Sequence, residues 1–184
     1  MAAKDPPGPR GRPAVDATEL RHLQRPLKQG YRDDPARALI RARAVGRLDV
    51  PTLTVTFDPR PGAAGLHRAA GGTGEHTCSA DMLLEALVAC AGVTLAAVAT
   101  AMAVPIRGAV VVAEGHWDAR GTLGVDRDVP VGLTDVSLRF ELDTDADEAT
   151  VDRLVTLAER YCVIAQTLAH PPAVAFSHTV SVAG

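Results

Sequence analysis

Residues 86–106 contain no charged side chain, and they form the centre of a longer apolar segment. That segment covers residues 79–104, is rich in alanine and leucine, and is followed at once by Pro105. Its composition predicts one long helix, with Ser79 as the N-cap and Asp81 in the first turn, where a negative charge favours the helix dipole. A helix that is apolar nearly all round needs cover from a sheet, other helices, a second subunit or a membrane.

The flanks of this segment argue against a membrane span. They lack the aromatic and basic anchors that are typical of a span, and the sequence downstream has the amphipathic patterns of soluble structure. The formal net charge is −3 and only 3% of the residues are aromatic. Neither value points to nucleic acid or to an acidic membrane surface as a partner. We therefore expect a soluble protein that binds neither nucleic acid nor a membrane.

The chain of 184 residues is long enough for one domain and short for two. Residues 1–16 are rich in proline and lack the apolar core of a signal peptide, which predicts a disordered tail before a single domain over residues 17–184. The three cysteines, Cys78, Cys90 and Cys162, are too few for a disulfide-stapled secreted protein and include no CxxC pair. Free thiols of this kind indicate a cytoplasmic protein.

Alternation and helical spacing along the chain predict the order β-β-α-β-β-α-β, an α+β fold with mostly antiparallel pairing. Pro26 is expected to leave only a short or broken helix before the first strand. The second long helix is expected to begin near Thr144 or Asp145 and to end before Pro171, with Cys162 on its buried face. The predicted strands are 38–45, 52–57, 108–119, 136–142 and 174–182, with a long loop over 58–77.

Each predicted long helix carries one cysteine near an apolar face. Cys90 lies in the middle of LVACAGVTL, and Cys162 lies in RYCVIAQTL. If the two helices pack together, the two sulfur atoms can meet. The alternative is that both cysteines are small buried hydrophobic residues, which is the usual fate of a free cysteine. Periodicity alone does not decide between these interpretations.

The run Ser79-Ala-Asp-Met-Leu-Leu-Glu-Ala-Leu-Val-Ala-Cys90, followed about seventy residues later by Glu-Arg-Tyr-Cys162, resembles the OsmC/Ohr family of thiol-dependent peroxidases. The resemblance covers roughly residues 38–182. It implies strongly curved antiparallel sheets that wrap two long central helices, and an intertwined homodimer with two active sites at the subunit interface. A second subunit would supply the cover that the apolar helix needs.

The resemblance implies a two-cysteine peroxidase that acts in oxidative stress defence. Cys90 would attack the peroxide O–O bond to give a sulfenic acid and an alcohol, and Cys162 would then form a disulfide with it. An external dithiol, such as a lipoyl protein, would reopen the disulfide, and no bound cofactor is implied. An apolar wall would suit organic hydroperoxides better than hydrogen peroxide. Its expected residues are Leu83, Leu87, Val163 and Leu168.

The resemblance also implies that an arginine near the first strands, held by an acidic residue, activates the nucleophilic thiol. Arg47, which follows a glycine, fits this role best, with Arg41 and Arg43 as alternatives on the same early strand. For all three, a solvated strand face is the other interpretation. Asp81 is the expected acidic partner, or it only favours the helix N-terminus.

Two positions depart from the family pattern. Ser79-Ala80 stand where the Ohr branch has Pro-Glu, and Val163 stands where many members have a proline directly after the resolving cysteine. The chain therefore resembles an OsmC-like branch rather than Ohr proper. The alternative function is a non-catalytic protein that binds a small ligand, or a redox sensor whose disulfide changes a partner surface.

Several other residues have expected roles outside the pair formed by Cys90 and Cys162. Glu85, a charge within an apolar helix, is expected to have a partner such as a basic side chain of the other subunit. Cys78 is expected to be a loop thiol or an alternative resolving cysteine. His76 and Cys78 form an H-x-C pair without a second ligand pair, so no metal site is predicted. His116 and Trp117 are expected to be packing or surface residues rather than general bases.

Overall fold

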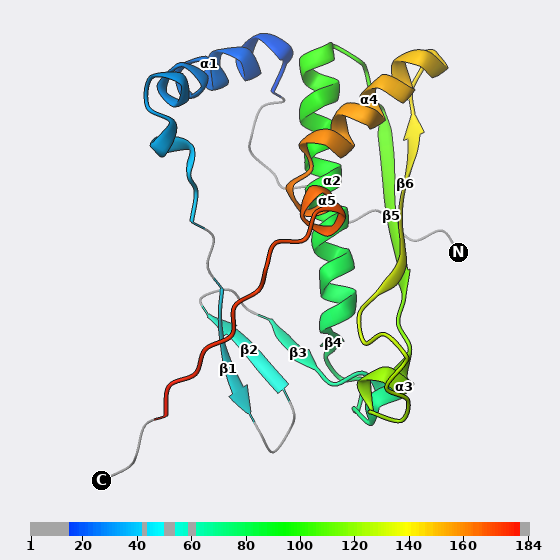
Figure 1. Cartoon of the computed structure of the whole chain (residues 1–184). Coiled ribbons are helices and arrows are strands. Elements are labelled where there is room, and N and C mark those ends of the chain that lie inside the picture. Colours follow the sequence, from blue (N-terminus) through cyan, green and yellow to red (C-terminus); the bar gives the residue numbers. More distant parts are fainter. Residues whose placement is uncertain (1–14, 42–43, 50–53, 59–61, 181–184) are drawn as a thin grey trace.

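The computed structural model describes residues 15–41, 44–49, 54–58 and 62–180 (Figure 1). Helices and antiparallel strands are mixed along the chain, and the fold is α+β, as predicted. In chain order, the elements are α1 (Ala17–Asp33), η1 (Pro35–Ala38), β1 (Val45–Asp49), β2 (Thr54–Asp58), β3 (Ala63–Gly65), η2 (Arg68–Ala70), β4 (Thr77–Cys78), α2 (Ser79–Met102), β5 (Gly108–His116), α3 (Ala119–Thr122), β6 (Thr134–Asp143), α4 (Glu148–Tyr161) and α5 (Val163–Ala169).

The strands form two separate sheets. Strands β1, β2, β3 and β4 make a four-stranded sheet in that order, antiparallel except for the parallel pair β3 and β4. Strands β5 and β6 make a long antiparallel hairpin whose register shifts between Glu114 and His116. The mostly antiparallel pairing confirms the prediction from the alternating sequence.

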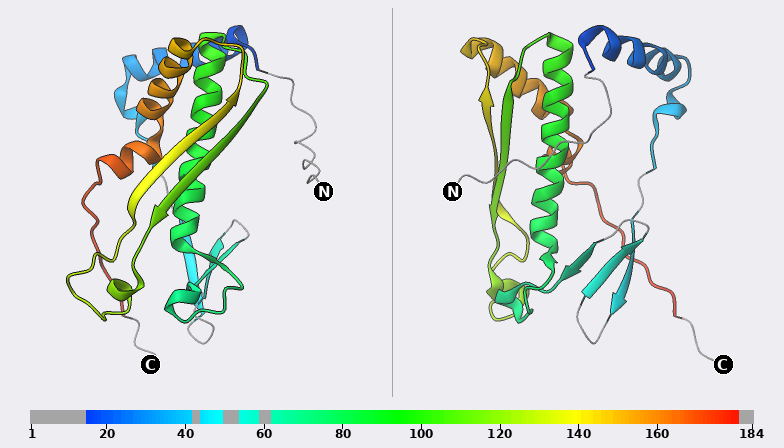
Figure 2. Two further views of the ribbon diagram at one scale, coloured as in Figure 1. Left: turned by 90° about the vertical axis from the view of Figure 1, so that its right-hand side faces the viewer. Right: turned by 180° about the vertical axis from the view of Figure 1, so that it is seen from behind.

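Helix α2 lies at the centre of the molecule. Figures 1 and 2 show it running along the β5–β6 hairpin, with α4 and α5 also in contact with it. Leu154 and Ala158 of α4 form one buried cluster with α2, and Cys162 joins a second cluster nearer the start of α2. The buried residues of α2 repeat every four positions and therefore share one face; they are Leu87, Ala91, Leu95 and Ala99.

The opposite face of α2 has no such cover within the described residues. Val93, for example, is 73% exposed. By length and composition alone the helix could cross a membrane, although the core helices of soluble proteins pass the same test. Only 22% of its most apolar stretch is buried within the chain. The hydrophobic effect therefore favours a cover for this face that lies outside the described chain.

The remaining elements lie towards the two ends of α2. The four-stranded sheet lies beyond the N-terminal end, to which β4 connects it, and α1 lies near the C-terminal end (Figures 1 and 2). Residues 170–180 run away from α5 and form neither helix nor strand. Their side chains are exposed, and Phe176 is 93% exposed.

The prediction of a short or broken helix around Pro26 was wrong. Helix α1 runs unbroken through Pro26 for 17 residues. The Asp16 carboxylate caps its start by accepting the N–H groups of Thr18 at 2.7 Å and Glu19 at 2.8 Å, and the Asp34 N–H bonds to the last turn. Because both ends are capped, the helix tolerates the one backbone hydrogen bond that proline cannot make.

The first strand was predicted too early in the chain. Residues 35–38 form η1, because Pro35 favours a tight turn and the Asp34 side chain accepts the Ala36 N–H at 3.2 Å. The first strand begins only at Val45, and the region predicted as a loop over 58–77 contains β3 and η2. Ser79 is the first residue of α2 rather than its N-cap, a position that Cys78 takes without a side-chain hydrogen bond.

The second long helix and the closing strand also differ from the prediction. The helix is divided at Cys162, whose backbone is extended (φ −75°, ψ 108°), so α2 is accompanied by α4 and α5 rather than by one long helix. The predicted strand 174–182 is not a strand over residues 174–180, and residues 181–182 lie outside the described residues. Within the described chain this segment pairs with no strand, and a strand needs a partner to satisfy its backbone groups.

Candidate active site

Cys90 and Cys162 lie in contact at the centre of the molecule. Cys162 is fully buried in a cluster with Leu87 and Ala91 of α2, and Cys90 packs against that cluster. Both are free thiols. The structure therefore brings together the two cysteines that the sequence pattern places near the apolar faces of separate helices.

The division of the helix at Cys162 supplies hydrogen-bond donors to both sulfur atoms. The first N–H groups of a helix have no partner within the helix. The Cys162 Sγ accepts the Ala165 N–H at 3.4 Å, as an N-cap side chain does. The N–H groups of Ile164 and Val163, at the start of α5, act on Cys90 and lower its pKa. No proline or glycine marks this break, so the sequence pattern gave no signal for it.

The pKa values of the two thiols are shifted in opposite directions. Burial acts to raise the pKa of Cys90, but hydrogen bonds from the Ile164 N–H and the Cys162 thiol outweigh it. The Val163 N–H and the Thr94 hydroxyl add to the effect, and the pKa of Cys90 is lowered. Burial raises the pKa of Cys162, and the adjacent Cys90 raises it further. The pair can therefore hold one thiolate, at Cys90, and one protonated thiol beside it.

An activating arginine does not lie beside Cys90 within the described single chain. The groups that lower the pKa of Cys90 are hydrogen-bond donors, with no cation among them. Arg47 lies exposed on β1, in the four-stranded sheet beyond the N-terminal end of α2 (Figure 1). Arg41 lies in the segment between η1 and β1, and Arg43 lies outside the described residues. The activating role of Arg47 stays a prediction.

The two carboxylates of α2 also lie apart from the dithiol. Asp81 is exposed in the first turn, where it complements the helix dipole. By helix geometry it lies about 13 Å along the axis from Cys90 and about half a turn around it. Glu85 is exposed and makes no ion pair with any other described residue. The roles predicted for both carboxylates stay predictions.

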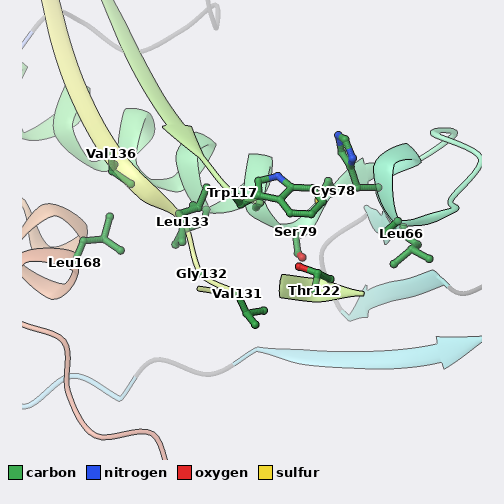
Figure 3. Close-up of a pocket in the computed structure, with 15 residues that line it drawn as sticks. Leu66, Cys78, Ser79, Trp117, Thr122, Val131, Gly132, Leu133, Val136 and Leu168 are labelled. Carbon is green, nitrogen blue, oxygen red and sulfur yellow. The ribbon is translucent and has the colours of Figure 1, made fainter. Parts of the chain in front are cut away.

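The four residues expected to form one apolar wall are divided between different surroundings. Leu87 is buried beside the dithiol, whereas Val163 is 68% exposed. Leu83 and Leu168 line a cavity of about 580 Å³ near the N-terminal end of α2 (Figure 3). Leu87 and Leu168 line a second cavity of about 450 Å³ beside β6. Among the described residues that line these two cavities, neither Cys90 nor Cys162 occurs.

The larger cavity contains the third cysteine. Cys78 and Trp117 both line it (Figure 3), and the Trp117 ring packs edge-on against His67, with ring centroids 5.1 Å apart. Along the helix axis Cys78 is about 18 Å from Cys90, too far for a disulfide within this conformation. In the described part of the chain, no group of three or more His, Cys, Asp or Glu side chains could hold a metal ion.

Comparison with known proteins agrees with the fold. The OsmC family model, described as OsmC-like protein, matches residues 72–177, more than half of the chain. Similar solved structures include an OsmC-like protein from Mycoplasma pneumoniae (17% identity, TM-score 0.61, covering 72% of this chain and 89% of that chain). They also include organic hydroperoxide resistance proteins from Legionella pneumophila (15%, 0.58, 72% and 93%) and Bacillus subtilis (18%, 0.52, 72% and 93%). No curated protein matches the sequence.

Proposed function

Because the chain belongs to the OsmC-like family, we propose that it is a thiol-dependent peroxidase that reduces organic hydroperoxides to alcohols. The family is linked to redox chemistry and peroxide resistance, and similar folds occur in proteins named for organic hydroperoxide resistance. The observation that carries the proposal is the contact between two free thiols whose pKa values are shifted apart. We place this activity in the cytoplasm, in oxidative stress defence.

In the first step, the Cys90 thiolate attacks the terminal oxygen of the hydroperoxide. An S–O bond forms as the O–O bond breaks, which gives a sulfenic acid on Cys90 and an alkoxide that takes up a proton and leaves as the alcohol. The N–H groups of Ile164 and Val163 support this step, because they favour the thiolate before the peroxide arrives.

In the second step, Cys162 attacks the sulfenic sulfur of Cys90. The charge of the Cys90 thiolate is one cause that raises the pKa of Cys162, and that charge is lost when Cys90 becomes an uncharged sulfenic acid. The pKa of Cys162 then falls, and the thiolate that forms closes the disulfide while water leaves. An external dithiol, such as a lipoyl group, reduces the disulfide by two thiol exchanges and becomes a disulfide itself. No bound cofactor enters this scheme.

We propose that the active protein is a homodimer. The support is the uncovered face of α2 around Val93, together with exposed apolar residues such as Phe176 in the C-terminal segment. Arg47 and Asp81 keep their proposed roles, as activating cation and as its acidic partner, only in such an assembly, because neither approaches Cys90 within one chain. The proposed substrate wall of Leu83, Leu87, Val163 and Leu168 is likewise divided in the single chain.

The decisive experiment measures the consumption of cumene hydroperoxide and hydrogen peroxide with dihydrolipoamide as reductant. We expect turnover with the organic peroxide, none in Cys90→Ser, and a single oxidation without turnover in Cys162→Ser. Cys78→Ser is the matched control and is expected to keep the wild-type rate, because Cys78 lies far from the dithiol. Arg47→Gln is expected to slow the oxidation of Cys90 without preventing disulfide formation. Undiminished turnover in Cys90→Ser would exclude the proposed nucleophile.

The cavity around Cys78 and Trp117 favours a second candidate function, the binding of a small apolar ligand without catalysis. The cavity holds about 580 Å³ and lies apart from both helix cysteines. Trp117 is the only tryptophan of the chain, so its fluorescence reports on this cavity directly. A ligand that changes this fluorescence, in a protein whose Cys90 is alkylated at mildly acidic pH no faster than an ordinary buried thiol, would favour the binding function.

A further inference from the structure

Helix α1 presents two separate stripes to its surroundings. Arg21, Arg25, Lys28 and Arg32 recur at helical spacing and share one face, within about 60° of each other. A second stripe, about 130° away around the helix, consists of Leu20, Leu23, Leu27 and Tyr31. Leu23 is 53% exposed and Leu27 is 50% exposed. Helix α1 contacts α2, but none of the residues of α1 is buried.

The basic stripe is not neutralised by the rest of the described chain. Arg25, Lys28 and Arg32 take part in no ion pair with another described residue. Arg21 donates a hydrogen bond to the Thr18 hydroxyl at 3.2 Å and lies near the Asp16 carboxylate. A hollow of about 720 Å³ on this helix is lined by these four cations together with His22, Pro26 and Gln29. The basic face is thus open to an anionic partner.

Positive and negative charges are also unevenly divided along the sequence. Residues 1–47 contain eleven basic and five acidic residues, a formal charge of +6, whereas the remainder of the chain carries −9. The net charge of −3 averages over these two parts and conceals the basic one. Helix α1 also lies outside residues 72–177, which the family model matches.

We propose that α1 is a peripheral binding element for an anionic lipid surface. An amphipathic helix with exposed leucines on one face and cations on another buries its apolar face at the boundary between headgroups and acyl chains, while the long basic side chains reach the lipid phosphates. A nucleic acid would use the cations but leaves the leucine stripe without a function, so the combination of both stripes favours the membrane surface. Binding of α1 to lipid is independent of the proposed peroxidase activity, because it is measured without peroxide turnover.

The test is cosedimentation of the full chain with phosphatidylcholine vesicles, with and without phosphatidylglycerol. We expect binding only to the anionic vesicles, and a strong reduction when salt rises from about 0.1 M to about 1 M, because screening shortens from about 10 Å to about 3 Å. Arg25→Gln with Lys28→Gln is expected to weaken binding about 30-fold, since each cation near such a surface contributes about 1 kcal/mol. Glutamine keeps the helix propensity of both positions.

Two further double variants distinguish binding through α1 from a general effect of surface charge. Arg127→Gln with Arg153→Gln removes the same charge from exposed positions elsewhere and is expected to bind as the wild type does. Leu23→Gln with Leu27→Gln keeps every cation and is expected to bind anionic vesicles less tightly. Equal binding to neutral vesicles, or wild-type binding by the Arg25 and Lys28 variant, would overturn the proposal. So would cation-dependent binding of random-sequence RNA that the leucine variant leaves unchanged, or a leucine variant that alters only self-association.

Discussion

Two regions of this molecule bury their apolar side chains to different extents. In the segment from α2 to α5, one chain brings helix and hairpin together around two buried clusters, and Leu154, Ala158 and Cys162 are completely buried. In the segment before α2 and in residues 170–180, no described residue is buried, and large apolar side chains such as Leu39 and Phe176 are exposed. The first, self-contained region builds both buried clusters within the chain, although one face of α2 stays uncovered. The second, open region has the composition to pack against something else.

This difference bears on where the proposed chemistry lies. Both thiols belong to the self-contained region, so their contact needs no second molecule. Arg47 belongs to the open region, and its distance from Cys90 in one chain follows from that placement. The contact between the proposed nucleophile and its proposed resolving partner is therefore formed within one chain, whereas the proposed activating cation reaches Cys90 only in an assembly of chains.

The largest expected effect is a loss of stability in the self-contained region. Leu154→Ala removes a fully buried side chain and is expected to lower the free energy of unfolding by about 2–5 kcal/mol. Urea denaturation at constant protein concentration measures it. Val125→Ala, at a 72% exposed position in the loop after α3, is the control and is expected within about 0.5 kcal/mol of the wild type for a surface site. An equal loss in both variants would show that burial within the chain does not set the stability of this region.

An intermediate effect is expected in the open region, on association rather than on folding. If residues 170–180 pack on a second copy, Phe176→Ala removes an aromatic side chain whose burial contributes about 1.5–3 kcal/mol, equivalent to about a 10-fold to 100-fold weaker dimer. Sedimentation equilibrium measures the change. Leu123→Ala, at an exposed position in the loop after α3, is the control and is expected to leave the dimer constant unchanged. An unchanged constant in Phe176→Ala would remove this segment from the interface.

The smallest effect concerns a single hydrogen bond at the dithiol. Val163 is the first residue of α5, a position that accepts proline, and Cys162 before it already has the extended backbone that proline requires of its neighbour. Val163→Pro is therefore expected to fold normally while it removes one N–H donor to Cys90.

Without that donor, the pKa of Cys90 rises towards its ordinary value. Because the thiolate is the reactive form, alkylation of Cys90 should lose rate at mildly acidic pH while the rate at high pH stays the same. Iodoacetamide labelling as a function of pH measures this shift, with Val163→Ala as the control that keeps the N–H. A profile identical to that of the control would show that the Val163 donor has no influence.

The elements predicted correctly from the sequence are those that local composition determines. The apolar run predicted a helix over 79–104, and α2 covers Ser79–Met102. The alternating segments predicted β5 and β6, with ends that differ by at most three residues. The apolar faces of the two helices allowed the two cysteines to meet without requiring it, and the pairing itself was implied only by the family resemblance.

The features that were missed depend on backbone geometry or on distant contacts. The break at Cys162 has no proline or glycine signal, since Tyr161 precedes it and Val163 follows it. The strand over 174–182 was predicted from alternation, but a strand also needs a partner strand, and residues 174–180 pair with none in the described chain. Helix α1 persists through Pro26 because of caps at both ends. The separation of Arg47 from Cys90 could not be predicted, because it depends on how the first sheet is placed relative to α2.

The contact between Cys90 and Cys162 also couples the stability of the folded state to the oxidation of the two thiols. A bond between their sulfur atoms would close a loop of about seventy residues, and in the chain-entropy treatment such a cross-link destabilises the unfolded state by about 4 kcal/mol. By thermodynamic reciprocity, the folded chain holds the two sulfurs in the bonded state more strongly than the unfolded chain does, by the same amount. The oxidised protein should therefore melt at a higher temperature than the reduced one.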